Sequence, residues 1–357
     1  MASVAQKIRF VQAADGVRLA YAETGQGPQV LVKAATWLSH LEVDGNSPVW
    51  RHLLDGLSER RRFVRYDERG CGLSDWQVPE LSFESWVRDL ETVVDAVQAS
   101  RFALLGISQG AAVAIAYAVR HPERVTHLVL HGGYARGRLV RSDSPAQREE
   151  AETMCRLAEL GWGKNDASFR QFFTSQFIPG GTQEQHRWFN EMERLSTSPA
   201  NAAQFMRVFN GIDVTANLPS VQCPTLVLHS RHDVRVPFAE GRLLASGIPG
   251  ARFVPLDSPN HLLLGDEPAW RVWLDAVRPF LAEGSRPALL EGLSSRQVQV
   301  LELVAQGLDN AQIAARLALS EKTVRNQVSA LLARLQVESR AQAIVRARDA
   351  GLGRGPA

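Results

Sequence analysis

A serine between two glycines is the first group in this chain whose type and spacing could do chemistry. The pentapeptide Gly106-Ile107-Ser108-Gln109-Gly110 follows the apolar run 102–105 and precedes an alanine- and valine-rich run over 111–119. Small residues beside a serine allow a strained turn between a strand and a helix, and this turn pushes the hydroxyl out of the sheet. The pattern therefore predicts a nucleophile at Ser108.

A serine hydroxyl is a weak nucleophile at neutral pH, and it needs a base that is oriented by a carboxylate. In this type of sheet the chain order is serine, acid, histidine. Asp233 follows the apolar run 226–229, and His261 follows the run 253–256. Three roles at three predicted strand ends indicate a triad of Ser108, Asp233 and His261.

Other residues near these strand ends compete for the same roles. His131, His229 and His232 also lie near predicted strand ends, where a histidine is more often a hydrogen-bonded structural residue than a base. Asp257 is an alternative acid, but it precedes His261 by only four residues and belongs to the same predicted loop.

Alternating strands and helices must position these residues. A hairpin signal at Asp15-Gly16 lies between the runs 8–11 and 17–22, and helical stretches separate the later apolar runs. This alternation predicts an α/β protein with a largely parallel sheet. The later strands are expected at 30–32, 63–66, 101–106, 125–131, 224–229 and 252–256, and the helices at 48–59, 83–99, 111–120, 237–246 and 268–281.

The stretch 134–220 interrupts the alternation, because it reads as helices without strands. Nine of the 26 aromatic residues fall between Trp162 and Phe209. An inserted helical cap over the sheet explains both observations. Most of these rings would fill the core of the cap, and those that face the crevice would favour an apolar or aromatic ligand.

Further stretches accompany the triad: the segment 65–75, the pair His232-Asp233, and Asn260-His261 with Glu267-Pro268 behind it. Together they resemble the α/β-hydrolase superfamily over about residues 8–282. The resemblance implies Ser108 as nucleophile, His261 as general base and Asp233 as its orienting acid. It also implies an acyl-enzyme and an oxyanion donor in the backbone N–H of Gln109.

One departure concerns the oxyanion hole. Where the superfamily usually has His-Gly after the third strand, this chain has Lys33-Ala34-Ala35-Thr36-Trp37. The second donor must then be a backbone N–H near Thr36 or Trp37. Loss of one donor costs on the order of 3 kcal/mol in the transition state, which slows catalysis without harming ligand binding.

The C-terminal part differs in charge and pattern. Residues 284–357 hold ten Lys/Arg against six Asp/Glu, a net charge of +4, which hints at nucleic-acid binding. Four helical segments and no strands follow the Gly/Pro-containing linker, and Ser294 with Gln297 forms a capping box. The helix from Glu321 to Leu335 carries apolar residues on one face. The other face of this helix presents Lys322, Thr323, Arg325, Asn326, Gln327 and Ser329. This polar face is interpreted either as a solvated surface or as a surface that enters the major groove of DNA.

The C-terminal part contains the pattern Leu293-Ser-x-Arg, then Val-Leu-x-Leu-Val-Ala-x-Gly-Leu-x-Asn, Ile-Ala-x-x-Leu-x-Leu-Ser-x-x-Thr-Val and Leu-x-x-Leu. This pattern resembles the LuxR-type (GerE-like) helix-turn-helix domain over 293–352. The resemblance implies that the helix from Glu321 reads DNA. It also implies a two-fold dimer contact through the last helix, 340–350, by Ala341, Ile344, Val345 and Arg348. The chain departs from the family at Gln297 and Gln299, usually Glu, at Gln327, commonly His, and at Gln336, commonly Gly.

Three cysteines without close pairing, no signal peptide and no apolar run long enough for a bilayer favour a cytoplasmic protein without a membrane segment. We expect neither a metal nor a cofactor. The expected organisation is a hydrolase-type domain at 1–282 with its cap at about 134–220, a linker at 283–290, and an all-helical DNA-binding domain at 291–357.

This organisation predicts a ligand-responsive transcriptional regulator that binds DNA as a homodimer. Its sensor domain is expected to bind a small apolar ester, lactone or acyl compound, with or without hydrolysing it. Two alternatives stay open. One is a serine esterase-type hydrolase with an accessory DNA-binding domain, and the other is a sensor in which the triad is inactive and the ligand stays intact.

Overall fold

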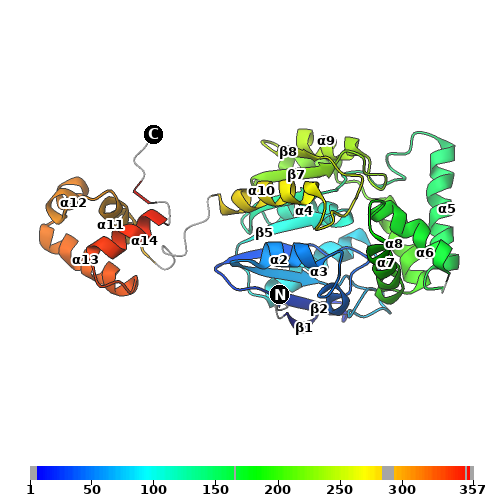
Figure 1. Cartoon of the computed structure of the whole chain (residues 1–357), viewed down its shortest axis with the longest axis horizontal. Helices are drawn as coiled ribbons and strands as arrows, with labels where there is room; N and C mark the ends of the chain where they lie inside the picture. The colour runs from blue at the N-terminus through cyan, green and yellow to red at the C-terminus, as the bar shows by residue number, and fades with distance from the viewer. Residues whose placement is uncertain (1–5, 165, 284–292, 350–351, 354–357) are drawn as a thin grey trace. The chain divides into compact units, whose positions relative to one another are not determined.

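The computed structural model describes residues 6–164, 166–283, 293–349 and 352–353. The chain divides into two units, Met1–Ala282 and Glu283–Ala357 (Figure 1). Residues 284–290 of the expected linker lie outside the described residues. Each unit has a hydrophobic core of its own.

The first unit is built on an eight-stranded sheet with the order β1-β2-β4-β3-β5-β6-β7-β8. The first two strands form the expected hairpin, β2 pairs antiparallel with β4, and all later pairs are parallel. The largely parallel α/β sheet that the sequence predicts is therefore confirmed. The strands are β1 Lys7–Gln12, β2 Arg18–Thr24, β3 Gln29–Lys33, β4 Arg61–Tyr66, β5 Phe102–Ile107, β6 Val125–His131, β7 Thr225–Ser230 and β8 Arg252–Leu256.

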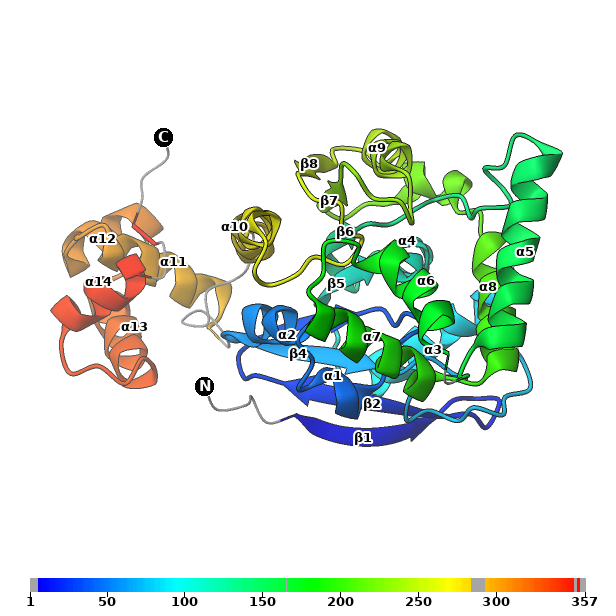
Figure 2. The same ribbon diagram turned by 45° about the vertical axis from the view of Figure 1, so that its right-hand side comes forward.

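Helices cover both faces of the sheet, with α2 and α10 on one face and α3 and α4 on the other (Figure 2). The central strand β5 is buried along its whole length, as expected for a parallel strand between two helical layers. The helices of this body are α1 Leu41–Asp44, α2 Arg51–Ser58, α3 Phe83–Ala96, α4 Gln109–Arg120, α9 Phe238–Gly247 and α10 Pro268–Ala282.

Four helices and a 3-10 turn lie between β6 and β7, where the sequence predicts the cap. Two of these helices start at Ser-Pro pairs: the hydroxyls of Ser144 and Ser198 accept backbone N–H bonds while proline takes the first helical position. The elements are α5 Pro145–Gly161, α6 Ala167–Phe177, α7 Gln183–Ser196, α8 Pro199–Asn210 and η1 Thr215–Ser220.

Most aromatic rings of the cap are buried within its own core and against the body. Trp162 stacks on Trp37 of the body with ring centroids 5.2 Å apart, and Phe209 lies 5.3 Å from the same Trp37 ring. Phe169 and Trp188 are half-buried, and Phe172 is exposed, with 44% of its surface accessible.

The described residues of the second unit form four helices. The capping box of Ser294 and Gln297 forms as predicted, and Asp309 forms a second one with Gln312. Ala318 adopts a left-handed conformation with φ 52° in the tight turn before α13. The helices are α11 Ser295–Ala305, α12 Asn310–Leu317, α13 Glu321–Arg334 and α14 Arg340–Asp349.

The turn between α13 and α14 is strained at Gln336. Its φ is 51°, in the left-handed region that costs an L-residue roughly 1–2 kcal/mol and a glycine nothing. This is the position at which the sequence departs from the usual glycine. The departure therefore has a structural cost, which the unit bears at an exposed site.

Gln336→Gly is expected to stabilise the second unit by about 1 kcal/mol, because the strain disappears. Hydrogen exchange of the α13 and α14 amides in the full chain measures this effect. The control is Ala333→Gly at an exposed helical position, which should destabilise the same amides by about 1 kcal/mol. Faster exchange in both variants would contradict the prediction.

Candidate active site and DNA-binding face

Ser108 occupies a sharp turn between β5 and α4. Its φ is 53° and its ψ is −126°, a conformation that few side-chain-bearing residues adopt. A Cβ added to Gly106 would lie 2.5 Å from Cα of Ala111, and one added to Gly110 would lie 2.9 Å from the Ala35 carbonyl oxygen. The two glycines are therefore required by packing, and the turn has the geometry of a nucleophile elbow.

Asp233 and His261 meet in the interior, as the sequence predicts. Nδ1 of His261 lies 2.7 Å from Oδ2 of Asp233, and both side chains are fully buried. Oδ1 of Asp233 accepts the N–H groups of Arg235 at 2.8 Å and Val236 at 2.9 Å. These bonds fix the carboxylate, which in turn fixes the imidazole ring.

The pKa of Asp233 lies below its ordinary value of 3.8. Burial raises it, but the charge of His261 and the hydrogen bonds to the carboxylate outweigh burial. The ionised form is therefore the stable form of Asp233 in the folded protein.

Ser108 and His261 both lie close to the Gly132-Gly133 segment. A Cβ on Gly132 would lie 3.1 Å from Cε1 of His261, and one on Gly133 would lie 3.7 Å from the Ser108 carbonyl oxygen. Among the described residues, no hydrogen bond joins the serine hydroxyl to His261. Nε2 of His261, the atom that would accept the serine proton, is buried without a partner.

The competing histidines have other contacts. His229 donates to the Val236 carbonyl at 3.0 Å, and His131 donates to the His261 carbonyl at 3.2 Å. Burial lowers the pKa of both rings, that of His131 to about 3. His232 and Asp257 face one another at the surface at 3.5 Å. Asp257 is therefore not the acid that holds His261.

The side chain of Gln109 occupies the region of the predicted oxyanion hole. Its Nε2 donates to Oε1 of Glu68 at 2.7 Å, and its Oε1 accepts the backbone N–H of Trp37 at 3.3 Å. The hydroxyl of Thr36 accepts from Nζ of Lys33 at 3.4 Å. Within the described chain, the backbone N–H groups of Thr36 and Gln109 have no hydrogen-bond partner.

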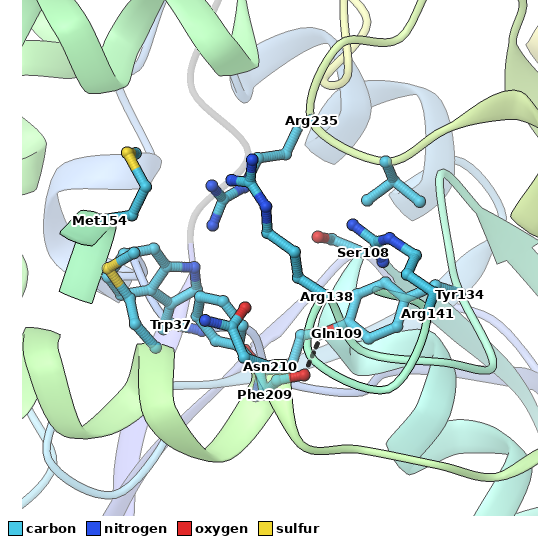
Figure 3. A pocket seen from close by; sticks show the side chains of 12 residues that line it. Trp37, Ser108, Gln109, Tyr134, Arg138, Arg141, Met154, Phe209, Asn210 and Arg235 are labelled. Carbon is cyan, nitrogen blue, oxygen red and sulfur yellow. Dashed lines mark hydrogen bonds between the residues drawn. The ribbon is translucent and has the colours of Figure 1, made fainter. Parts of the chain in front are cut away.

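A pocket of about 480 Å³, with the open space at its mouth included, lies over Ser108 (Figure 3). It is less apolar than the sequence predicts, and of the nine cap aromatics noted above only Phe209 lines it. Three arginines that sequence reasoning missed line it as well. The lining residues are Trp37, Ser108, Gln109, Tyr134, Arg138, Arg141, Met154, Met206, Phe209, Asn210, Arg235 and Val236.

A signal for these arginines exists in the sequence. Arg235 stands two residues after the predicted acid, and Arg138 and Arg141 stand in the first ten residues after β6, where the cap begins. Loops at the carboxyl ends of parallel strands line the ligand crevice. Charged residues in these loops are therefore candidates for ligand contacts.

The predicted DNA-reading face lies on α13, whose apolar residues Val324, Val328 and Leu331 are buried. Five of its six predicted contact residues are exposed: Lys322, Thr323, Arg325, Asn326 and Ser329. Gln327 is half-buried, and its Oε1 is enclosed without a partner. In the described part of the chain, Lys322 and Arg325 form no ion pair. Their charges are therefore available to phosphates.

The predicted dimer residues lie on α14. Ala341 and Val345 are exposed, Val345 to 58%, and Ile344 is half-buried. Nε of Arg348 donates to the Ala305 carbonyl at 2.9 Å within the same unit.

Among the described residues no helix is both long and apolar enough to cross a membrane, and no cluster of three or more His, Cys, Asp and Glu is arranged to hold a metal.

Two family models match the chain. Residues 44–268 match the alpha/beta hydrolase fold, and residues 291–347 match the bacterial regulatory proteins of the luxR family. Both resemblances stated from the sequence are thereby confirmed.

Similar proteins include an AB hydrolase superfamily protein and an esterase. The chain is 25% identical over 262 residues to the AB hydrolase superfamily protein YisY of Bacillus subtilis, covering 71% of this chain and 91% of that protein. It is 28% identical over 258 residues to the pimeloyl-[acyl-carrier protein] methyl ester esterase of Nitrosomonas europaea, covering 67% and 90%.

Solved structures share the fold of the first unit. A hydrolase from Pseudomonas aeruginosa superposes with a TM-score of 0.65 at 25% identity, covering 78% of this chain and 99% of that one. The enol-lactonase from Burkholderia xenovorans superposes with a TM-score of 0.61 at 21% identity, covering 77% and 100%.

Asp233→Asn is expected to destabilise the first unit by roughly 2 kcal/mol at pH 7, because His261 loses a charged hydrogen-bond partner. Since the folded pKa of Asp233 lies below 3.8, its contribution is complete above about pH 5 and is lost as pH falls through 3.8 towards the folded pKa. Chemical denaturation between pH 3 and pH 7, followed by far-ultraviolet circular dichroism, measures the difference from the wild type.

Asp257→Asn is the control, because this carboxyl is exposed to 92% and faces His232; it should change the free energy of unfolding by less than about 0.5 kcal/mol. The assigned role of the carboxylate would be contradicted if the difference in the free energy of unfolding between the wild type and Asp233→Asn stayed constant from pH 7 to pH 3.

Proposed function

Because the chain belongs to the alpha/beta hydrolase fold family and carries a luxR-family DNA-binding domain, we propose that it is a ligand-responsive transcriptional regulator. Its hydrolase-fold domain binds a small apolar ester, lactone or related acyl compound in the pocket over Ser108, and its C-terminal domain binds DNA. The observation that carries the proposal is the combination, in one chain, of a pocket over a nucleophile elbow and an exposed basic helix face.

The ligand would be engaged through the triad. Ser108 attacks the carbonyl carbon while Nε2 of His261 takes the hydroxyl proton, and Asp233 stabilises the resulting imidazolium. The leaving group takes this proton as the acyl-enzyme forms, and water, activated by His261, then releases the acid. The buried and unpartnered Nε2 of His261 supports this role.

The oxyanion would be held by the backbone N–H of Gln109 and by that of Thr36, which have no partner among the described residues. The N–H of Trp37 is the less suitable second donor, because Oε1 of Gln109 already accepts it at 3.3 Å. An acceptor oxygen next to the proposed oxyanion hole would disfavour negative charge there, which supports slow turnover rather than fast catalysis.

The regulator would act as a cytoplasmic homodimer. Val345 and Ala341 on α14 offer an exposed apolar face for a two-fold contact. The three cysteines, Cys71, Cys155 and Cys223, are buried and free, which suits a reducing compartment.

A second candidate is a serine esterase with an accessory DNA-binding domain. The similar proteins include a methyl ester esterase, and the Asp233–His261 pair is fully formed. The other alternative is a sensor in which the triad is inactive and the ligand stays intact. The contact between the Gln109 side chain and the Trp37 backbone favours this alternative. Turnover and labelling of Ser108 separate these candidates.

The purified chain is expected to hydrolyse short p-nitrophenyl esters slowly and to be labelled at Ser108 by a fluorophosphonate, because His261 activates the hydroxyl. Ser108→Ala should abolish both signals. Ser258→Ala, at a buried serine hydrogen-bonded to Glu267, is the control and should still be labelled at Ser108. Equal inertness of the wild type and Ser108→Ala, with no label, would leave only the intact-ligand sensor.

Lys322→Ala combined with Arg325→Ala is expected to weaken binding to the DNA upstream of the chain's own gene. Each lost phosphate contact removes about one unit from the slope of log K against log salt, so the slope should fall by up to about 2. Fluorescence anisotropy with a labelled duplex at several salt concentrations measures it. The matched control is Arg148→Ala with Arg187→Ala, two exposed arginines of the cap; an unchanged affinity in the α13 variant would refute the assigned face.

A further inference from the structure

The pocket over Ser108 carries a concentration of positive charge that binding of an apolar compound does not require. Arg138 and Arg141 enter it from the segment between β6 and α5, and Arg235 enters it from the loop after β7. Figure 3 shows these three side chains lining the pocket together with Ser108. Arg138 and Arg141 therefore lie where the chain passes from the sheet into the cap, and Arg235 lies in the loop that also carries Asp233.

Arg235 is held firmly in place. Its guanidinium lies 5.1 Å from the ring centre of Phe177 and 5.5 Å from that of Phe209, and it donates to Oε1 of Gln176 at 3.0 Å. Its backbone N–H donates to Asp233 at 2.8 Å. Burial, with the neighbouring charges of Arg138 and Arg141, lowers the pKa of Arg235 to about 10. The side chain is therefore positively charged at neutral pH.

Arg141, like Arg235, forms no ion pair among the described residues. Its guanidinium lies 5.8 Å from the ring centre of Tyr134 and donates to the Arg136 carbonyl at 2.9 Å. Across the described ranges of the first unit, no carboxylate forms an ion pair with Arg141 or Arg235. Glu150 binds Arg138 at 2.6 Å, and Glu240 binds Arg136 at 2.7 Å.

Among the described residues, Arg141 and Arg235 have no carboxylate in direct ion-pair contact, although the charges of Glu240 and Asp233 act favourably on them. Partly buried charges without a direct partner are costly, because such charges are normally paired. Their cost is offset when an anion enters the pocket. Guanidinium groups bind carboxylates and phosphates through two parallel hydrogen bonds, and such charged bonds are among the strongest in proteins. The remaining lining, which includes Trp37, Met154 and Phe209, suits an apolar chain.

We propose that the compound bound over Ser108 is an anionic ester or acyl compound, whose carboxylate or phosphate group is held by Arg141 and Arg235 with Arg138 beside them. The carbonyl lies at Ser108, and a short apolar chain joins the two ends. This inference rests on the proposed function, since it places the ester carbonyl at the elbow. It changes the expected ligand from an apolar molecule to one with a charged end.

The test compares three esters of similar length for binding to the full chain with Ser108→Ala, which removes turnover. Methyl hexanoate is neutral, monomethyl adipate ends in a carboxylate, and methyl 4-phosphonobutanoate ends in a phosphonate. Isothermal titration calorimetry is expected to show at least about tenfold tighter binding for one or both anionic esters than for methyl hexanoate. The tighter of the two identifies the anionic group.

Arg141→Met in the same background is expected to remove about tenfold of this preference while the neutral ester binds as before. Arg141→Lys should retain part of it, because the charge remains. Arg148→Met, an exposed arginine of α5 outside the pocket, is the control and should retain all of it. An equal loss for neutral and anionic esters in Arg141→Met would show a structural role and would overturn the assignment.

The comparison of the three esters needs no arginine variant, so it stands even where such a variant fails to fold. If methyl hexanoate binds as tightly as both anionic esters, the anionic end is wrong while the ester-binding function survives. If none of the three esters binds at millimolar concentration, the ester-binding function and this inference both fail.

Discussion

The carboxylate of Asp233 is the group on which the centre of the first unit depends. One oxygen holds the imidazole of His261 at 2.7 Å, and the other holds the backbone of the loop that carries Arg235. A single buried charge therefore sets the position of the proposed base and the position of a pocket cation. Two neighbouring histidines add no charge of their own, because burial lowers the pKa of His131 and of His229, and each ring donates its N–H to a backbone carbonyl.

The fold brings these groups together by a general property of parallel sheets. Ser108, Asp233 and His261 each follow a strand, and the carboxyl ends of β5, β7 and β8 lie at one edge of the sheet. The cap then covers this edge, and its rings pack on Trp37 of the body. The pocket is what remains between the sheet edge and the cap, and for this reason its lining mixes body loops with cap helices.

Residues at strand ends were predictable, because an apolar run, a turn signal and a polar residue define such an end without knowledge of the tertiary structure. The same holds for the capping box of Ser294 and for the buried face of α13. The direction of loop side chains was not predictable. Whether Arg141 points into the crevice, or whether Gln109 reaches Glu68 and the Trp37 amide, depends on neighbours far away in the sequence. The cap aromatics illustrate the same limit, since their number suggested an apolar crevice while most of them fill the cap itself.

The stacked pair of Trp37 and Trp162, with ring centroids 5.2 Å apart, has an optical consequence. Trp37 lines the pocket and Trp162 follows α5 of the cap, so their exciton coupling varies with the separation of cap and body. Every aromatic residue of the chain precedes residue 284. The intrinsic fluorescence of the protein and the near-ultraviolet circular dichroism of its aromatic residues therefore arise wholly from the hydrolase-fold unit. The stacked pair is thus a spectroscopic probe of the hydrolase-fold unit alone, because the luxR-type domain contributes no aromatic signal.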